Sequence, residues 1–260
     1  MKKFALLGHN IDYSFSPKIH TLVFDHVGVM ASYTLISASE KELPTIWKTT
    51  LQHLDGFNVT KPHKKNILPF ITTKESAVNT VVNNSQTHTG HNTDYDGFKL
   101  HVEELSISLK DKTALVLGAG GVAESIVPVL LQKGAKVFVH SVFEEEAKEF
   151  AARHSVEIAS CNEGQYDVVV NATVLGLHKG ENPAPKIDLS KTELVYDAIY
   201  FETDFLKMAR ELKVKFVENG LGMLIYQAIA ADEYFLNIKI PDKKALKEKI
   251  MQEILATKEN

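Results

Sequence analysis

Two polar segments, residues 58–64 and 92–94, carry a lysine and a carboxylate that could transfer protons at one site. The first reads Asn-Val-Thr-Lys-Pro-His-Lys and ends at Lys64, and the second reads Asn-Thr-Asp and ends at Asp94. A lysine can exchange a proton with a substrate, and a nearby carboxylate can orient the ammonium group or share its proton. With the glycine-rich turn that follows, the pair is typical of a dehydrogenase.

The glycine-rich turn is Gly118-Ala119-Gly120-Gly121, between a predicted strand over 113–117 and a predicted helix. Small residues let the backbone approach a pyrophosphate, and the helix N-terminus adds partial positive charge. The alternative is a strand-to-helix turn that needs glycine only for tight packing. The doubly wound pattern of the residues that follow favours nucleotide binding.

The choice between two nicotinamide cofactors is usually set at the end of the second strand of such a unit, roughly 20 residues beyond the turn. Aspartate or glutamate there suits an unphosphorylated ribose, and arginine suits a 2′-phosphate. This chain has His140-Ser141-Val142, which gives neither signal, followed by three glutamates over 144–146. The glutamates favour a helix start as a solvated terminus, but they would also disfavour a phosphate dianion nearby.

Composition excludes several partners. The chain has 260 residues, of which 44% are hydrophobic and 24% charged, and this is enough for two cores. Its formal charge of -4 provides no broad basic field, so nucleic acid is not expected as a partner. Among its 11 histidines no pair has metal-ligand spacing on a predicted helix with a third ligand, so no metal is expected.

The compartment is inferred from the first residues and the cysteine content. Lys2 and Lys3 precede a short apolar run that Gly8 interrupts, which favours a first strand over a signal peptide. No stretch approaches the roughly 20 apolar residues that span a bilayer. The single cysteine, Cys161, cannot form an internal disulfide and has no activating neighbour in the sequence. A cytoplasmic protein without a membrane partner is expected.

Hydrophobic periodicity predicts a small α/β unit in the first 97 residues. The predicted strands cover 4–7, 32–36 and 56–59, with a helix from Ser16 and another over 40–51. Ser16 is predicted to cap its helix, with Pro17 in the first helical position. Residues 80–83 and 87–91 flank Asn84-Ser85-Gln86 and predict a hairpin that leads to Asp94.

The second half predicts a doubly wound parallel sheet. Its buried strands are expected over 114–117, 137–140, 156–159, 167–170, 194–198 and 215–217. An apolar helix over 221–235 and an amphipathic helix over 241–256, with Leu246, Ile250, Ile254 and Leu255 on one face, are expected to pack on the first unit. The predicted domains are therefore 1–97 plus 225–260 for substrate binding and catalysis, and 98–224 for the dinucleotide.

Taken together, the polar segments resemble those of the shikimate dehydrogenase family over almost the whole chain. The resemblance rests on Ser14-Phe15-Ser16-Pro17-Lys18-Ile19-His20, Asn58-Val59-Thr60-Lys61-Pro62-His63-Lys64, Ala77-Val78-Asn79-Thr80, Gly90-His91-Asn92-Thr93-Asp94, the glycine-rich turn, Asn171-Ala172-Thr173 and Asn219-Gly220-Leu221-Gly222-Met223-Leu224-Ile225-Tyr226-Gln227. Blocks in the same order are far more specific than any one of them.

The resemblance implies a role for each block. Lys64 and Asp94 would be the proton-transfer pair at the carbon that changes oxidation state. The substrate carboxylate would be held by Ser14, Ser16 and Tyr200, and the ring hydroxyls by Asn58, Thr60, Asn79 and Gln227. The nicotinamide cofactor would contact Gly118, Ala119, Gly120, Gly121, Val122, His140, Ser141, Asn171, Thr173, Gly220 and Met223.

The activity that the resemblance implies is the reversible reduction of 3-dehydroshikimate to shikimate with NADP, by a monomer or homodimer. The family usually has Asn-Arg-Thr where this chain has His140-Ser141-Val142, and its arginine binds the 2′-phosphate. An NAD-preferring quinate or shikimate dehydrogenase is therefore an alternative. A second alternative is a non-catalytic shikimate-binding relative, which the retention of Lys64 and Asp94 disfavours.

Overall fold

The computed structural model describes residues 1–84, 87–159 and 163–256. Its chain divides into two compact units, each considered by itself below. Unit 1 comprises Met1–Gly97 and Ile225–Asn260, and unit 2 comprises Phe98–Leu224. Cys161 and the turn residues Ser85 and Gln86 lie outside the described residues, so the predictions made for them stay predictions.

Unit 1 contains a mixed five-stranded sheet in the order β2-β1-β3-β4-β5. Its strands are β1 (Lys2–Gly8), β2 (Ala31–Ser37), β3 (Gly56–Val59), β4 (Thr80–Asn83) and β5 (His88–His91). β1 pairs in parallel with β2 and β3, whereas β4 pairs antiparallel with β3 and β5. The predicted hairpin is therefore present, and β3 lies in the middle of the sheet with all four residues buried.

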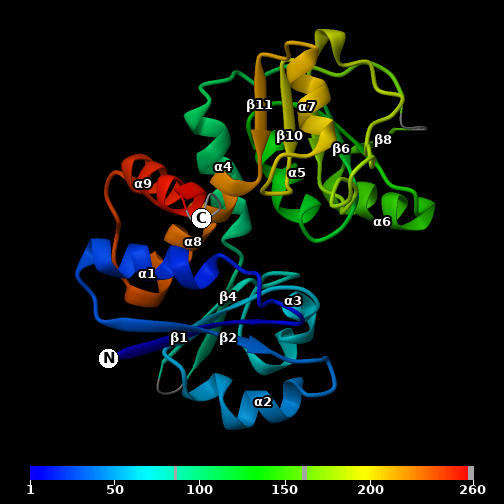
Figure 1. The fold of residues 1–260 in the computed structure, drawn as a ribbon. Helices are drawn as coiled ribbons and strands as arrows, with labels where there is room; N and C mark the ends of the chain where they lie inside the picture. Colours follow the sequence, from blue (N-terminus) through cyan, green and yellow to red (C-terminus); the bar gives the residue numbers. More distant parts are fainter. Residues whose placement is uncertain (85–86, 160–162, 257–260) are drawn as a thin grey trace. The chain divides into compact units, whose positions relative to one another are not determined.

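The two faces of this sheet carry different helices because alternate side chains of a strand point to opposite faces. Ala5 and Leu7 of β1 pack in one cluster with α2 (Leu43–Thr49), whereas Phe4 and Leu6 pack in another with α1 (Ser16–Val27) and α8 (Leu221–Leu236). Figure 1 shows α1 and α8 on one side of the sheet and α2 on the other.

Four further elements complete unit 1. They are η1 (Leu51–His53), α3 (His63–Asn66), η2 (Leu68–Phe70) and α9 (Lys243–Ala256). Lys18 of α1 donates a hydrogen bond from its Nζ to the carbonyl of Glu253 in α9, and Leu246, Ile250 and Ile254 are buried. The last helix therefore belongs to the first unit.

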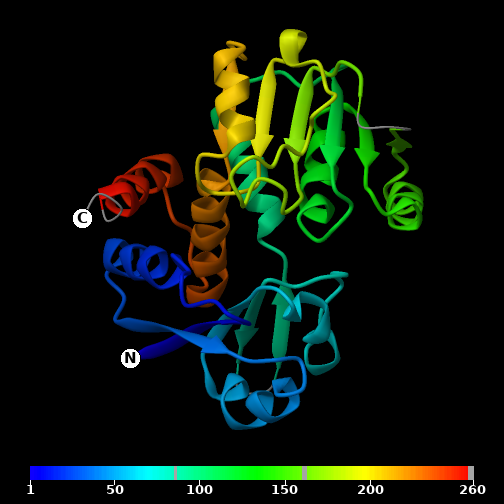
Figure 2. The ribbon, with the colours of Figure 1, turned by 45° about the vertical axis from the view of Figure 1, so that its right-hand side comes forward.

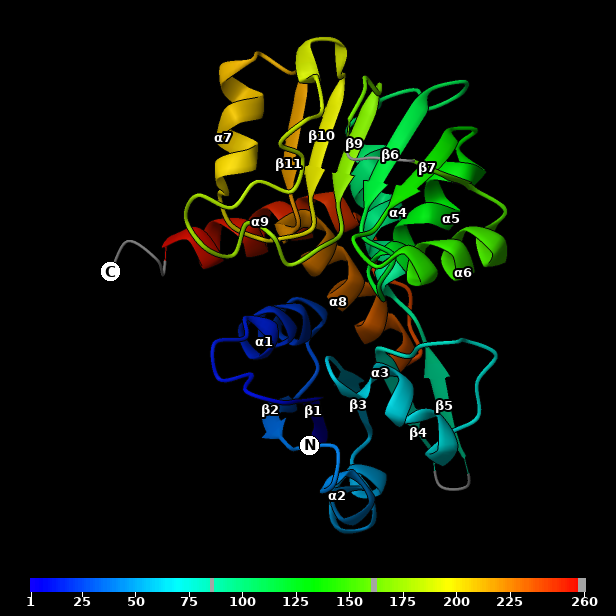
Figure 3. The same ribbon diagram turned by 90° about the vertical axis from the view of Figure 1, so that its right-hand side faces the viewer.

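Unit 2 contains a six-stranded parallel sheet in the order β11-β10-β9-β6-β7-β8. Its strands are β6 (Thr113–Leu117), β7 (Lys136–His140), β8 (Glu157–Ile158), β9 (Val168–Asn171), β10 (Leu194–Asp197) and β11 (Phe216–Asn219). Figure 2 shows the arrows running in one direction, and Figure 3 shows β11, β10, β9, β6 and β7 side by side. The order reverses at β6, as in a doubly wound dinucleotide-binding sheet.

Helices lie between several of these strands. They are α5 (Ala123–Gln132), α6 (Glu144–His154) and α7 (Asp204–Glu211), with a short η3 (Leu189–Lys191). Before the first strand comes α4 (Asp94–Glu104), which begins in unit 1 and ends in unit 2. One face of the sheet packs Leu115, Val169 and Val195 against Phe205 and Leu206 of α7. The predicted α/β fold class, with a mixed-sheet first unit and a Rossmann-like second unit, is confirmed.

Four local predictions are wrong. Ser16 does not cap α1, because Phe15 is already helical before it (φ -76, ψ -9) and the Ser14 hydroxyl accepts the Ser16 N–H. The helix expected over 40–51 begins only at Leu43, with Pro44 in its first turn, and ends at Thr49. The strand expected over 156–159 is two exposed residues at the sheet edge, and Leu255 is 48% exposed because it turns away from the buried face of α9.

Candidate active site

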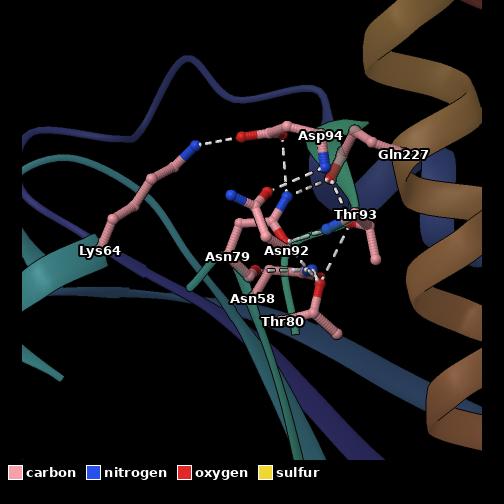
Figure 4. A network of polar contacts seen from close by, with 8 residues as sticks. All are labelled: Asn58, Lys64, Asn79, Thr80, Asn92, Thr93, Asp94 and Gln227. Atoms are coloured by element: carbon pink, nitrogen blue, oxygen red, sulfur yellow. Dashed lines mark hydrogen bonds and ion pairs between the residues drawn. The ribbon is translucent and has the colours of Figure 1, made fainter. Parts of the chain in front are cut away.

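Lys64 and Asp94 form an ion pair in unit 1. Lys64 lies in α3, just after β3, and Asp94 is the first residue of α4, just after β5. The Lys64 Nζ lies 2.5 Å from Asp94 Oδ2, and the two side chains are 24% and 12% exposed. Figure 4 shows the lysine extending toward the carboxylate. Partial burial strengthens the attraction relative to an open surface, and the remaining exposure leaves the ammonium group accessible to a ligand.

The backbone around Lys64 is fixed by two contacts. His63 is fully buried, and its Nε2 lies 2.8 Å from the carbonyl oxygen of Ala38. The carbonyl of Lys64 accepts a hydrogen bond from the N–H of Val78 at 2.9 Å. Because α3 has only four residues, these contacts rather than helix propagation set the direction of the lysine side chain.

The side-chain amide of Asn79 holds Asp94 in place. Its Nδ2 donates to Asp94 Oδ1 at 2.8 Å and to Gln227 Oε1 at 3.2 Å. Its Oδ1 accepts from the N–H of Thr93 at 2.8 Å and from Thr80 Oγ1 at 3.0 Å. An asparagine amide has two donor hydrogens, and both are used here. The carboxylate is thus held by one oxygen, and the other faces the lysine.

Asn58 is held by the same network on β3. Its Nδ2 donates to the carbonyl of Asn79 at 3.1 Å and to Thr80 Oγ1 at 3.0 Å, and its Oδ1 accepts from the Tyr33 hydroxyl at 2.7 Å. Only a second lone pair of Oδ1 is left, so Asn58 could accept a hydrogen bond from a ligand but not donate one. Thr60 follows β3, is partly exposed and has no side-chain hydrogen bond within the described residues.

Ser14 and Ser16 place two hydroxyl groups side by side before and at the start of α1. The Ser14 hydroxyl donates to Ser16 Oγ at 3.1 Å. The Ser14 oxygen also accepts the N–H of Ser16 at 3.2 Å, which fixes the turn. Two neighbouring hydroxyls can bind the two oxygens of one carboxylate.

The glycine-rich turn of unit 2 joins β6 to α5. Gly118 has φ +101°, a conformation that side chains other than glycine rarely adopt, and its N–H donates to the carbonyl of His140 at 2.7 Å. A Cβ added at Gly120 or Gly121 would meet nothing within 4 Å. The backbone there faces open space at the N-terminus of α5, so the turn fits a pyrophosphate.

The loop after β9 is shaped by Asn171. Its Nδ2 donates to the carbonyl of Leu175 and to Asp197 Oδ1, both at 2.9 Å, and its Oδ1 accepts from the N–H and hydroxyl of Thr173 at 3.0 and 2.6 Å. Burial raises the pKa of Asp197, which hydrogen bonds from Ile199, Thr203 and Asn171 partly offset. The Asn171 side chain is therefore committed to the loop itself.

Gly220 and Met223 begin the last connection of unit 2. A Cβ at Gly220 would lie 2.1 Å from the carbonyl oxygen of Ala198, so this position requires glycine. Met223 is buried in α8, 7% exposed. Both residues follow β11, on the side of the sheet where the carboxyl ends of the parallel strands lie.

The end of β7 presents carboxylates. The Ser141 hydroxyl donates to Glu146 Oε2 at 3.1 Å. Lys148 is paired with Glu144 at 2.8 Å and with Glu145 at 2.9 Å, and the hydrogen bonds to Glu144 and then Glu145 raise the pKa of Lys148. The positive charge of Lys148 is therefore already compensated by two glutamates, and the Ser141 hydroxyl is hydrogen-bonded to a third.

Known proteins resemble this chain in both sequence and structure. Residues 6–84 match the family model described as the shikimate dehydrogenase substrate binding domain. The chain is 33% identical over 268 residues to the NADP(+) shikimate dehydrogenase of Nitrosopumilus maritimus, covering 94% of this chain and 98% of that protein. It is 35% identical over 277 residues to that of Caldanaerobacter subterraneus, covering 97% and 98%.

The chain belongs to the shikimate dehydrogenase family. Among solved structures, it is similar to shikimate 5-dehydrogenase from Thermus thermophilus in complex with NADP(H) and shikimate. The two superpose with a TM-score of 0.88 at 28% identity, covering 97% of this chain and 99% of that chain.

The predicted site residues of this family member divide between the two units. Unit 1 brings Lys64, Asp94, Asn58, Asn79 and Gln227 into one hydrogen-bonded network and holds Ser14, Ser16 and Thr60. Unit 2 holds Tyr200 and the predicted cofactor residues, namely Gly118, Ala119, Gly120, Gly121, Val122, His140, Ser141, Asn171, Thr173, Gly220 and Met223.

Sequence reasoning missed four side chains that support this family site. Thr80 and Thr93 are fully buried members of the network and were visible in the sequence as parts of the quoted blocks. His63 was quoted within a block but given no role, although it anchors α3. Tyr33 gave no sequence signal, because it is one aromatic residue in an alternating strand.

The part of the chain that the structure describes contains neither a cluster of metal-ligand side chains nor a membrane-spanning helix. Its residues contain no group of three or more histidine, cysteine or acidic side chains that could hold a metal ion. Within the same part of the chain, no helix is both long and apolar enough to cross a membrane.

Alanine substitutions at Gly120 and Gly220 distinguish a glycine that a ligand approaches from a glycine that is needed for packing within the chain. In Gly120→Ala the methyl group enters open space, so the unfolding free energy should change by less than about 1 kcal/mol. The KM for NADP should rise about tenfold or more, because the methyl occupies the backbone surface that a pyrophosphate approaches.

The control Gly220→Ala places a methyl against Ala198 and should lose about 1–3 kcal/mol of stability. Urea denaturation and cofactor titration measure both effects. A Gly120→Ala variant with wild-type KM for NADP would contradict the assignment of the turn.

Proposed function

We propose that this chain catalyses the reversible, NADP-dependent reduction of 3-dehydroshikimate to shikimate. The observation that carries the proposal is the Lys64–Asp94 ion pair within the Asn79 network of unit 1. It is supported by the identity of 33% to an NADP(+) shikimate dehydrogenase along nearly the entire chain. It is further supported by the similarity to the Thermus enzyme that binds NADP(H) and shikimate.

Proton transfer falls to Lys64 and Asp94. Reduction of a ketone leaves negative charge on its oxygen, and a nearby ammonium group stabilises that charge and supplies a proton. In the reverse direction the same pair accepts the proton of the substrate hydroxyl. The two groups lie 2.5 Å apart, within hydrogen-bonding reach of each other. We assign Lys64 as the chief donor and acceptor.

Substrate binding follows from the hydrogen-bonding groups of unit 1. Ser14 and Ser16 would hold the carboxylate, and the role predicted for Tyr200 of unit 2 stays a prediction. Thr60 and Gln227 would pair with ring hydroxyls, and Asn58 would accept from one. Asn79 was predicted for the same role, but its donors and its acceptor oxygen are engaged, so it would act by holding Asp94. Neutral amides and hydroxyls suit such a ring, because each buried hydroxyl needs a partner.

The nicotinamide cofactor would be held by the open backbone of Gly120 and Gly121 and by the N-terminus of α5. When bound, it supplies the hydride for reduction and accepts it in the reverse direction. Gly118 and Gly220 would shape the surface, since neither position has room for a Cβ without displacement of a neighbour. Unit 2 is proposed as the dinucleotide domain, and unit 1 as the substrate and catalytic domain.

A second candidate is an NAD-preferring quinate or shikimate dehydrogenase. The contact between Ser141 and Glu146, together with the paired Lys148, favours it, because a 2′-phosphate would meet carboxylates there. A non-catalytic shikimate-binding protein is disfavoured, since a binder needs no proton-transfer pair. A cytoplasmic location and a monomer or homodimer stay predictions.

Initial rates of shikimate and quinate oxidation with NADP and with NAD test the proposed activity. The kcat/KM for shikimate with NADP is expected to exceed that of the other three combinations by about tenfold or more, a difference of about 1.4 kcal/mol in transition-state binding. Glu146→Gln should lower the KM for NADP and leave the KM for NAD unchanged, because it removes only a negative charge. Higher kcat/KM with NAD would overturn the cofactor assignment, and no turnover with either would overturn the activity.

Replacement of the lysine tests the catalytic pair. Lys64→Ala is expected to lower kcat by about 10²–10⁴-fold, because the developing charge loses its proton donor. The shikimate Kd, measured calorimetrically, should change little. Lys65→Ala is the matched control, since Lys65 is the next residue of α3 and is exposed. Near-normal kcat in Lys64→Ala would refute the assignment.

A further inference from the structure

Unit 1 contains a buried polar cluster that the proposed chemistry does not use. The Nδ1 of His20, in α1, lies 2.8 Å from Oδ1 of Asp232, in α8, and both residues are 0% exposed. The His20 ring stacks on Tyr33 of β2, with ring centroids 4.1 Å apart and planes within 8°. The cluster therefore joins three elements on one face of the sheet.

Stability alone does not explain this cluster. Burial raises the pKa of Asp232, and His20 only partly offsets that effect. Nε2 of His20 and Oδ2 of Asp232 have no hydrogen-bond partner among the described residues. Buried polar atoms without partners are destabilising, and apolar side chains of similar size would often be at least as stable.

Tyr33 connects two parts of the proposed substrate site. Its hydroxyl donates to Asn58 Oδ1 at 2.7 Å, and its ring stacks on His20, which lies one turn along α1 from Ser16. Burial, followed by the charge of Asp232, raises the pKa of Tyr33 well above its usual value, so the hydroxyl keeps its proton and donates it to Asn58.

A directed series of hydrogen bonds runs from Tyr33 to the proton-transfer pair. Tyr33 donates to Asn58. Asn58 donates to Thr80, Thr80 to Asn79, and Asn79 to Asp94. Tyr33 is therefore the link between α1, which contains Ser16 and His20, and the amides that hold the pair.

We propose that Tyr33 is a positioning residue that sets the spacing between the carboxylate-binding hydroxyls and the proton-transfer pair, and that His20 and Asp232 hold its ring. The proposal rests on the proposed function. A rigid ring must engage its carboxylate and its reacting carbon together, and small misplacement of either group is expensive in rate. The tyrosine connects α1, which begins at Ser16, to the hydrogen-bonded network that holds the proton-transfer pair.

Tyr33→Phe tests the link, since it keeps the stacked ring and removes one oxygen. The kcat/KM for shikimate should fall about tenfold or more, with the KM for NADP within about twofold of wild type. The rate preference for shikimate over its methyl ester should shrink at least about fivefold, because the carboxylate no longer controls the position of the reacting carbon. A merely structural role would leave that preference unchanged.

The matched control is Tyr234→Phe. Tyr234 also lies in unit 1 and stacks on a histidine, His91, with ring centroids 4.0 Å apart, but it is 42% exposed. It loses the same atom and should keep wild-type kinetics and ester preference. Tyr33→Phe with wild-type values of both would overturn the proposal.

The role of the buried pair is tested at Asp232. Asp232→Asn keeps an oxygen that can accept from His20 Nδ1, so kinetics should stay near wild type, whereas Asp232→Ala should reproduce the ester effect of Tyr33→Phe. If both variants keep the wild-type ester preference, His20 and Asp232 do not hold the ring. A wild-type chain that neither binds nor oxidises shikimate would instead refute the proposed function, and with it this inference.

Discussion

The hydrogen bond from Asn79 Nδ2 to Asp94 Oδ1 is the contact on which the site of unit 1 depends. It is 2.8 Å long and buried, and it fixes which carboxylate oxygen faces Lys64. The asparagine can do this because its own oxygen is held by Thr93 and Thr80. A buried amide whose polar atoms are all engaged has one orientation, so the ion pair is preorganised rather than mobile.

Unit 2 achieves its geometry by close backbone approach instead of side-chain networks. Gly220 lies against the Ala198 carbonyl, and Gly118 lies against Thr173 and Ala172. At Gly120 the opposite holds, because the space beside its backbone is open. Glycine is needed at the first two positions for packing within the chain, and at the third for a ligand. Glycine is thus required for different physical reasons at different positions of unit 2.

The sequence predicted the fold class well because periodicity is a property of each strand. In β1, alternate residues do face different clusters, and the six parallel strands of unit 2 lie within one or two residues of their predicted bounds, although β8 is exposed rather than buried. Predictions of local detail were wrong where neighbouring residues determine the conformation. Ser16, for example, does not cap α1, and its N–H donates to the Ser14 hydroxyl. The polar blocks predicted Lys64 and Asp94, but Tyr33 and Asp232 enter the network through contacts between distant segments, which no local pattern encodes.

The central claim is that Lys64 and Asp94 act as one unit. A double-mutant cycle on kcat measures this directly, with Lys64→Ala, Asp94→Ala and the combined variant assayed under saturating shikimate and NADP. If the pair acts together, the combined variant should be no more than about threefold slower than the slower single variant, since the second substitution removes a group that is already ineffective. Losses that multiply across the two substitutions would show independent roles and would contradict the account.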